Sequence, residues 1–195
     1  MDEYRIAIAL WDGVEELDFA GPYEVLTAWS RMSERHVTVT SASRDGATVT
    51  CSHGLKVVPD VSFDAVGDLD LFVMPGGNTR PLLDDGEFIA SVRRFADGGA
   101  LMASVCTGAF VFQKAGLLEG RRAATHWSAV ENLEALGVDV DRDARFVDEG
   151  MVVTAAGVSA GIDMALHLVA RLESDEMSAA VRRYIQYEPA AVTTA

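Results

Sequence analysis

The segment LMASVCTGAFVFQKAGLL places one of the chain's two cysteines at an abrupt change of pattern. A buried apolar run ends at Cys106, and a helical pattern begins directly after it. Small residues stand two positions away on each side, Ser104 and Gly108, as a tight turn from strand to helix requires. This context favours a nucleophilic cysteine, although a free cysteine also packs in many cores without any chemical role.

The helix that follows would direct its free N–H groups and the positive end of its dipole at the Cys106 sulfur. Such a position stabilises a thiolate relative to a thiol, so we expect Cys106 to be ionised near neutral pH. The thiolate is the form of cysteine that attacks an electrophile. The sequence therefore predicts covalent catalysis through this sulfur.

The segment DGVEELDFAGP carries three acids, Glu15, Glu16 and Asp18, just ahead of a predicted helix. Any one of them could simply complement the helix dipole. Asp18 differs in its neighbours, because burial of the flanking Leu17 and Phe19 would bring its carboxyl group to an apolar site. Proton affinity rises in such a site, and a carboxyl group tuned in this way can both give and take a proton.

Two further segments could face the cysteine. The glycines of MPGGN, Gly76 and Gly77, could present backbone N–H groups to a developing negative charge, or could simply form a tight turn that needs positive φ. His126 is expected at the carboxyl end of the strand RRAATHW, where it could form a hydrolase dyad with Cys106. With Trp127 it could equally shape the wall of a pocket.

The elements that must position these groups alternate along the chain. Strand patterns cover residues 4–10, 36–43, 69–78 and 100–106; hairpin-like patterns cover 48–63 and 144–156; helical patterns cover 21–32, 87–99, 107–118, 128–136, 159–172 and 174–186. Apolar strands separated by helices predict a flavodoxin-like, three-layer α/β sandwich with a mainly parallel sheet and helices on both faces. Ligands of such folds bind at the carboxyl ends of the strands, where Cys106 lies.

The composition narrows the class of protein. The 195 residues, 49% of them apolar, are expected to form one domain over 1–195. The net charge of −14 repels nucleic acid and anionic membranes. The amino-terminal segment has no basic region of a signal peptide, and no run approaches a membrane span of about 20 residues, so a cytoplasmic protein is expected. Disulfides are rare there, which predicts at least one free thiol.

Several motifs together resemble the ThiJ/PfpI superfamily, with its glutamine-amidotransferase-like fold. They are GVEELDFAGPYEVL, MPGG, SVCTGAFVF, AGLLEGRRAATHW, AGVSAGIDMAL and YIQYEP, in the same order. Within the superfamily the chain is most similar to isonitrile hydratases, which add water to an isocyanide and give an N-substituted formamide. The resemblance implies Cys106 as nucleophile, Asp18 as proton carrier and Thr107 as a third catalytic residue. It also implies a small-molecule substrate, a homodimer, and neither metal nor organic cofactor.

Two departures bear on the activity. Peptidase-like members carry histidine directly after the cysteine, whereas this chain has Thr107, which weighs against a protease or amidase. Ala20 stands where the hydratase motif carries threonine, which leaves the turnover of isocyanides open. Phe19, Phe110 and Trp127 could line an apolar substrate cavity or belong to the core.

Two other functions remain open. One is a glyoxalase or redox enzyme of the same superfamily that uses Cys106 with Asp18, and selective oxidation of Cys106 would support it. The other is a sensor that is not an enzyme, because transcription regulators of the AraC type contain a similar domain. Those regulators append a DNA-binding helix-turn-helix, which is not expected here because the chain ends at YEPAAVTTA and its charge opposes DNA binding.

Overall fold

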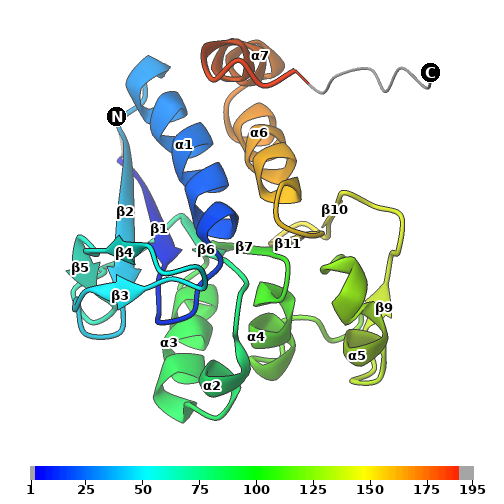
Figure 1. Ribbon diagram of the computed structural model, residues 1–195. Coiled ribbons are helices and arrows are strands. Elements are labelled where there is room, and N and C mark those ends of the chain that lie inside the picture. Colours follow the sequence, from blue (N-terminus) through cyan, green and yellow to red (C-terminus); the bar gives the residue numbers. More distant parts are fainter. Residues whose placement is uncertain (1–2, 189–195) are drawn as a thin grey trace.

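A seven-stranded sheet forms the centre of the computed structural model, which describes residues 3–188 (Figure 1). In spatial order its strands are β10 (Phe146–Asp148), β11 (Val152–Ala155), β7 (Leu101–Val105), β6 (Leu71–Met74), β1 (Tyr4–Ala9), β2 (Val37–Ser43) and β5 (Val61–Ser62). Neighbouring strands are parallel except β10 and β11. The central strands are apolar nearly throughout because both faces are covered. The predicted flavodoxin-like fold is confirmed.

Helices cover both faces of this sheet (Figure 1). One face carries α1 (Glu16–Met32), α6 (Ala160–Leu172) and α7 (Asp175–Tyr184), and the other carries α2 (Arg80–Leu83), α3 (Gly86–Asp97) and α4 (Gly108–Lys114). A separate cluster of buried side chains fills each of the two interfaces. Among the residues that the structure describes, no helix combines the length and apolar character that crossing a membrane requires.

Two small sheets lie outside the central one. The strands β3 (Val49–Thr50) and β4 (Lys56–Val57) form the predicted hairpin, but its expected continuation, β5, pairs in parallel with β2 instead. The strands β8 (Arg122–Ala123) and β9 (Asp139–Val140) pair only with each other in their sheet, beside the short helices η1 (Trp127–Ala129) and α5 (Val130–Glu134). Within RRAATHW only Arg122–Ala123 form a strand, so His126 does not end that strand as expected.

Helix α1 begins five residues earlier than the Gly-Pro pair predicted, at Glu16. A Gly-Pro pair is typical of a helix start, but here Gly21 and Pro22 lie inside the helix, where α1 meets α6. A Cβ on Gly21 would lie 2.9 Å from Cγ1 of Ile162. The close approach of two helices, and not a helix boundary, therefore explains this glycine. The earlier start also puts Asp18 in the first turn of α1.

The last residue of the YIQYEP motif, Pro189, lies outside the described residues. The motif's preceding residues leave helix α7 and pass close to α6, because the Tyr187 hydroxyl donates to Oδ1 of Asp163 at 3.0 Å. This contact fixes the end of the described chain on the face of the sheet that α1 and α6 cover.

Candidate active site

Cys106 lies at the turn between β7 and α4 in a strained conformation. Its φ is 57°, which places a residue other than glycine in the left-handed region and costs about 1–3 kcal/mol. Hydrogen bonds hold the turn: the Cys106 N–H donates to the carbonyls of Ala155 and Ala156, and Thr125 Oγ1 donates to the Cys106 carbonyl at 2.7 Å. The predicted tight turn from strand to helix at Cys106 is confirmed.

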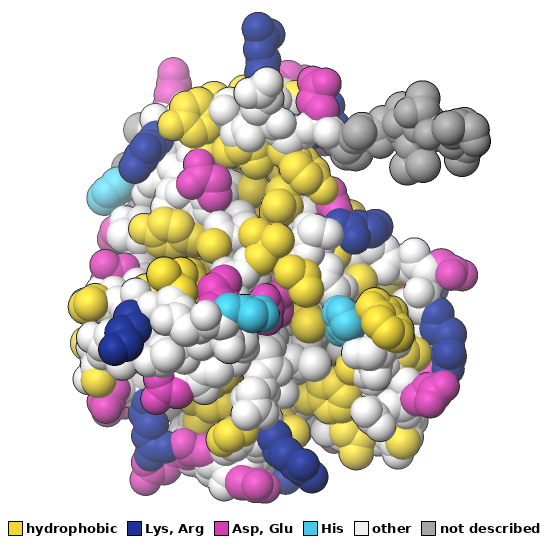
Figure 2. All heavy atoms as spheres, viewed as in Figure 1, with side chains coloured by type: hydrophobic (Ala, Val, Ile, Leu, Met, Phe, Trp, Pro, Cys, Tyr) yellow, Lys and Arg dark blue, Asp and Glu magenta, His cyan; other side chains and the backbone are white. Residues whose placement is uncertain are grey.

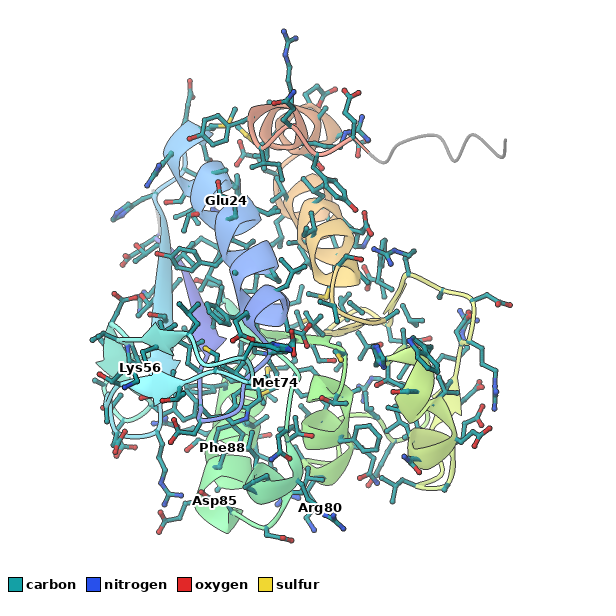
Figure 3. The ribbon with its side chains drawn as sticks, viewed as in Figure 1. Glu24, Lys56, Met74, Arg80, Asp85 and Phe88 are labelled. Atoms are coloured by element: carbon teal, nitrogen blue, oxygen red, sulfur yellow. The ribbon has the colours of Figure 1, made fainter. Side chains whose placement is uncertain are left out.

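Glycines allow the neighbouring strand ends to crowd this turn. A Cβ on Gly108 would collide with the carbonyl oxygen of Met74, the last residue of β6. A Cβ on Gly76 would lie 2.6 Å from Oδ2 of Asp18 and 2.7 Å from the Thr107 nitrogen. The labelled Met74 in Figure 3 marks where β6 ends near the middle of the molecule. The Asp18 carboxyl group and the Cys106 turn can lie this close to the end of β6 only because Gly76 and Gly108 have no side chains.

Asp18 is completely buried at the start of α1. Its Oδ2 accepts a hydrogen bond from the Gly76 N–H at 2.9 Å. Its Oδ1 has no hydrogen-bond partner of normal geometry within residues 3–188, and the carboxyl group interacts with the Cys106 thiol. Leu17 does not cause this burial as the sequence predicted, because its side chain is 41% exposed. The orientation of the helix turns Asp18 inward instead.

The proton affinity of Asp18 follows the prediction. Burial raises the pKa of its carboxyl group from the ordinary 3.8 to about 7. The hydrogen bond from the Gly76 N–H and the interaction with the Cys106 thiol lower this pKa, and the nearby charge of Glu15 raises it. Asp18 is therefore close to half protonated at neutral pH, which suits a group that must accept and return a proton.

The expected ionisation of Cys106 is wrong. Burial raises the pKa of its thiol from 9.0 to about 12, and the charge of Asp18 raises it as well. The N–H groups of Thr107 and Val158 lower this pKa, but α4 is only seven residues long and its N-terminus does not outweigh burial. Asp18 and Cys106 therefore hold one proton between them above pH 7, and the sulfur is a thiol until Asp18 removes that proton.

The backbone groups that could have bound a developing negative charge are already used. The Gly76 N–H donates to Asp18, and the Gly77 N–H donates to Thr107 Oγ1 at 2.9 Å. The Thr107 hydroxyl in turn contacts the Gly77 carbonyl at 2.9 Å. Gly77 has a φ of 124°, so the tight-turn reading of this glycine pair holds. Thr107 thus joins the Cys106 turn to the loop after β6, which makes it a positioning residue.

His126 and Trp127 differ from their expected places. His126 caps the short helix η1, with its Nδ1 2.8 Å from Ser128 Oγ, and within residues 3–188 no hydrogen bond joins this ring to Cys106. Trp127 is 81% exposed, so it does not line a closed pocket. The ring of His126 packs against Gly157, where a Cβ would collide with it. The dyad reading is therefore not supported.

Val158 is a site residue that the sequence did not reveal. Its φ is 39°, and its N–H approaches the Cys106 sulfur from the segment that leads into α6. Residues with a branched Cβ rarely adopt positive φ, so nothing in the motif AGVSAGIDMAL indicated this conformation. Thr125 was likewise missed, because its bond to the Cys106 carbonyl joins segments 19 positions apart.

A group of side chains near the surface could in principle bind a metal ion. It consists of Glu15, Glu16 and His53, with His53 Nδ1 2.9 Å from Glu16 Oε2. Acidic side chains and a histidine lie together near the middle of the face in Figure 2. The hydrogen bond to Glu16 and the charges of both acids raise the pKa of His53. Their mutual pairing accounts for this arrangement, because protonated histidine bridges the two carboxylates.

Known proteins are similar to this chain in sequence. The model of the DJ-1/PfpI family matches residues 4–171. Isonitrile hydratase of Pseudomonas putida is 36% identical over 187 residues, which are 95% of this chain and 79% of that protein. The HTH-type transcriptional regulator GbdR of Pseudomonas aeruginosa strain UCBPP-PA14 is 29% identical over 94% of this chain, which spans only 50% of the regulator.

Solved structures agree with this assignment. A crystal structure of a ThiJ/PfpI family protein from Pseudomonas syringae superposes with a TM-score of 0.89 at 28% sequence identity. The match covers 100% of this chain and 79% of the other. The strained cysteine after β7, the family model over most of the chain and the identity to a curated relative lead to one conclusion. The chain belongs to the DJ-1/PfpI family.

Proposed function

We propose that the protein hydrates an isocyanide, R–N≡C, to the N-substituted formamide R–NH–CHO. The observation that carries the proposal is the buried pair of Cys106 and Asp18, in which burial raises the carboxyl pKa to about 7 and holds one proton beside the sulfur. The isonitrile hydratase of Pseudomonas putida, 36% identical over 95% of this chain, supports the choice of substrate.

The first half of the reaction forms a bond between the Cys106 sulfur and the terminal carbon of the isocyanide. The Asp18 carboxylate takes the thiol proton as the sulfur attacks, because the thiol, whose pKa is about 12, does not ionise alone. Asp18 then delivers this proton to the same carbon. The product is the thioimidate R–N=CH–S–Cys106, which contains all atoms of the isocyanide and the thiol.

The second half adds water to the thioimidate. Asp18, again a carboxylate, accepts a proton from water as the oxygen attacks the carbon, and the nitrogen takes up that proton. The adduct R–NH–CH(OH)–S–Cys106 collapses when the carbon–sulfur bond breaks, and the hydroxyl proton returns to the sulfur by way of Asp18. Formamide leaves, and the thiol and carboxylate are restored. Thr107 holds the Cys106 turn against Gly77 throughout.

The test is formamide production from small aliphatic and aromatic isocyanides by purified wild type, Cys106→Ala and Cys51→Ala. Cys51 is a matched control, because it is also a buried free thiol but lies in the turn between β3 and β4. Wild type and Cys51→Ala should turn over the same isocyanides. Cys106→Ala should be slower by at least about a thousandfold, as expected when a covalent nucleophile is removed.

Two results would contradict the proposal: no turnover of any isocyanide by wild type, or equal turnover by Cys106→Ala. Methylglyoxal then serves as the next substrate for the same three proteins. Its consumption only when Cys106 is present would assign the pair to carbonyl chemistry instead. Ala20→Thr is a further variant to measure. Faster isocyanide turnover by this variant would show that the threonine hydroxyl of the hydratase motif assists the reaction and that wild type lacks this assistance.

A homodimer is also part of the proposal. Leu17 and Tyr23 on α1 are exposed, and on the neighbouring hairpin Val58 is 73% exposed. Apolar side chains form a band over α1 and α6 on the face in Figure 2. Closed two-fold pairs are the commonest oligomers, and such a surface suits a second copy. Light scattering after gel filtration should give twice the chain mass of 20.9 kDa, and a mass equal to one chain would refute the dimer.

We further propose that the protein acts in the cytoplasm. Cys51 and Cys106 are both free, and free thiols persist in a reducing compartment. In an oxidising compartment the Cys106 thiol would in time be oxidised, and the nucleophile that the reaction requires would be lost. Fractionation of the source cells followed by detection of the protein should place it with cytosolic markers, and recovery with exported proteins would refute this location.

A further inference from the structure

The start of helix α1 places a second acid, Glu15, beside Asp18. Glu15 caps the helix and Asp18 is its third residue, and the side chains of these two positions lie next to each other, as in a capping box. The Asp18 N–H also donates to the Glu15 carbonyl at 3.2 Å. Two neighbouring carboxylates repel each other, so a charge on Glu15 favours the protonated form of the buried Asp18.

The backbone of Gly76 holds both acids in place. The Glu15 N–H donates to the Gly76 carbonyl at 3.0 Å, and the Gly76 N–H donates to Oδ2 of Asp18 at 2.9 Å. The loop after β6 therefore fixes the main chain of Glu15 and the carboxyl group of Asp18 at the same point. The fold, and not a mobile side chain alone, sets the separation of the two acids.

The hairpin turn between β3 and β4 brings a histidine to this helix start. His53 Nδ1 lies 3.5 Å from Oε1 of Glu15 and 2.9 Å from Oε2 of Glu16, and the His53 N–H donates to Oε1 of Glu16 at 2.8 Å. Ser52 anchors the turn, because its N–H donates to the Val14 carbonyl at 2.8 Å. The imidazole ring therefore has a defined place over the start of α1.

These side chains connect the surface to the buried site. The side chain of His53 is 74% exposed, that of Glu15 is 24% exposed, and Asp18 is completely buried. The hydrogen bond to Glu16 and the charges of both glutamates raise the pKa of His53, so the ring keeps its positive charge to higher pH than a free histidine does. A positive charge on His53 offsets the charge of Glu15 and weakens the repulsion that Glu15 exerts on Asp18.

The other charges in this region act elsewhere. Within residues 3–188, Glu15 is the carboxylate whose charge acts on Asp18, and Glu15 and Glu16 are the charged groups that act on His53. Asp12 precedes them and accepts from the Thr50 N–H at 2.7 Å. Its charge acts on the thiol of Cys51 and not on the site.

We propose that Glu15 and His53 are positioning residues that set the pH at which the Asp18–Cys106 pair gives up its first proton. Glu15 favours the protonated carboxyl group, and His53, by pairing with Glu15, favours the carboxylate that must accept the thiol proton. This inference rests on the proposed function for the role of the pair, but the proton affinity that it concerns can be measured without an isocyanide.

The test measures the rate at which iodoacetamide alkylates Cys106 at a series of pH values, in a Cys51→Ala background that leaves Cys106 as the one thiol of the chain. The rate should rise as the pair loses its first proton, because Asp18 can then accept the thiol proton. Glu15→Gln removes the like charge and should lower the midpoint of this rise by about one pH unit. His53→Ala should raise it by about half a unit, since salt screens the exposed ring.

Further variants separate charge from structure. His53→Lys keeps a positive charge and should not raise the midpoint. The double variant of Glu15→Gln and His53→Ala should have the midpoint of Glu15→Gln alone, because His53 acts through Glu15. Two matched controls should leave the midpoint unchanged: His36→Ala, at an exposed histidine just before β2, and Glu24→Gln, at an exposed acid further along α1 (Figure 3).

Three results would overturn the proposal. They are an unchanged midpoint in Glu15→Gln, an equal rise in His53→Ala and His53→Lys, and a double variant in which the two single shifts simply add. Isocyanide turnover by the same proteins keeps this outcome apart from the proposed function. Shifted alkylation midpoints without any turnover would support the role of Glu15 and His53 and refute the hydratase, whereas turnover with unshifted midpoints would do the reverse.

Discussion

The Asp18→Asn substitution removes a buried charge and keeps an oxygen that can accept from the Gly76 N–H. The carboxyl pKa is raised by burial to about 7 in the folded protein, against an ordinary 3.8 when unfolded. Below the pKa of the unfolded chain the carboxyl group is protonated in both states, and its contribution to stability is fully present. As pH rises from that value through the pKa of the folded protein, this contribution is lost, because the unfolded chain ionises first. Wild type should therefore lose stability between about pH 4 and 8, whereas the variant has no group to titrate at this position.

The size of this loss follows from the difference between the two pKa values, 3.8 and about 7. A difference of roughly 3 units at about 1.4 kcal/mol each amounts to about 4 kcal/mol over the whole range. About 3 kcal/mol of it falls between pH 5 and pH 8, because the carboxyl group of the unfolded chain is ionised there while that of the folded protein keeps its proton up to about pH 7. Asp18 is completely buried, so solvent does not screen this effect as it does at the surface.

The assay is urea unfolding followed by circular dichroism, at closely spaced pH values for wild type and Asp18→Asn. Asp68→Asn is the matched control, because Asp68 is an exposed acid just before the amino end of β6, whereas the site lies after the carboxyl end of that strand. The difference in free energy of unfolding between wild type and Asp18→Asn should shift by about 3 kcal/mol in favour of the variant as pH rises from 5 to 8. The buried amide NH₂ of the variant lowers its free energy of unfolding by about 1–3 kcal/mol at every pH. This offset moves the plot of unfolding free energy against pH without changing its slope.

Parallel curves for wild type and Asp18→Asn would refute the reasoning, because they would mean that Asp18 ionises in the fold as easily as in water. A tilt of the same size in Asp68→Asn would also refute it. A second readout follows the thiol: removal of the Asp18 charge should lower the pKa of Cys106, whose thiolate absorbs in the ultraviolet.

Three further substitutions test the residues around the site. Thr125→Val leaves the buried Cys106 carbonyl without its donor and should lower the free energy of unfolding by about 1–3 kcal/mol in urea, whereas Thr125→Ser should restore most of it. Gly76→Ala places a Cβ 2.6 Å from the Asp18 carboxylate and should slow isocyanide turnover by about a hundredfold, and unchanged turnover would contradict the geometry. Val158→Gly relieves a backbone with φ of 39° and should raise the thermal midpoint, by an amount that corresponds to about 1 kcal/mol; a lower midpoint would show that the valine side chain outweighs its strain.

The order of strands and helices was predictable because each element carries its own pattern. The apolar runs that end at Met74 and Cys106 are β6 and β7, and the amphipathic pattern after Asp85 is α3. The spacing of apolar residues is a local property, so it identifies a strand or a helix without any knowledge of what that element packs against. Boundaries were less certain, as helix α1 shows: its Gly-Pro pair marks a contact with α6 that lies more than 130 residues away in the sequence.

The residues of the candidate site were also predictable from their types. A cysteine between small residues after a buried strand identified the turn. The raised pKa of Asp18 was expected from burial of Leu17 and Phe19, but Leu17 is exposed and the orientation of α1 buries the carboxyl group instead. The motifs that carry the family resemblance fixed both positions. Spacing was sufficient for Cys106, because a tight turn from strand to helix restricts which residues can flank the cysteine.

The state of those groups was decided only by the tertiary structure. A short helix after Cys106 suggested a thiolate, but burial and the Asp18 charge raise the thiol pKa to about 12. The Gly76 N–H is taken by Asp18, and Val158 turns its own N–H toward the sulfur. A protonation state or a free donor depends on every neighbour in space, and these neighbours come from distant parts of the chain. The sequence by itself indicated Cys106 and Asp18, whereas packing determined which other groups meet them and where the proton lies.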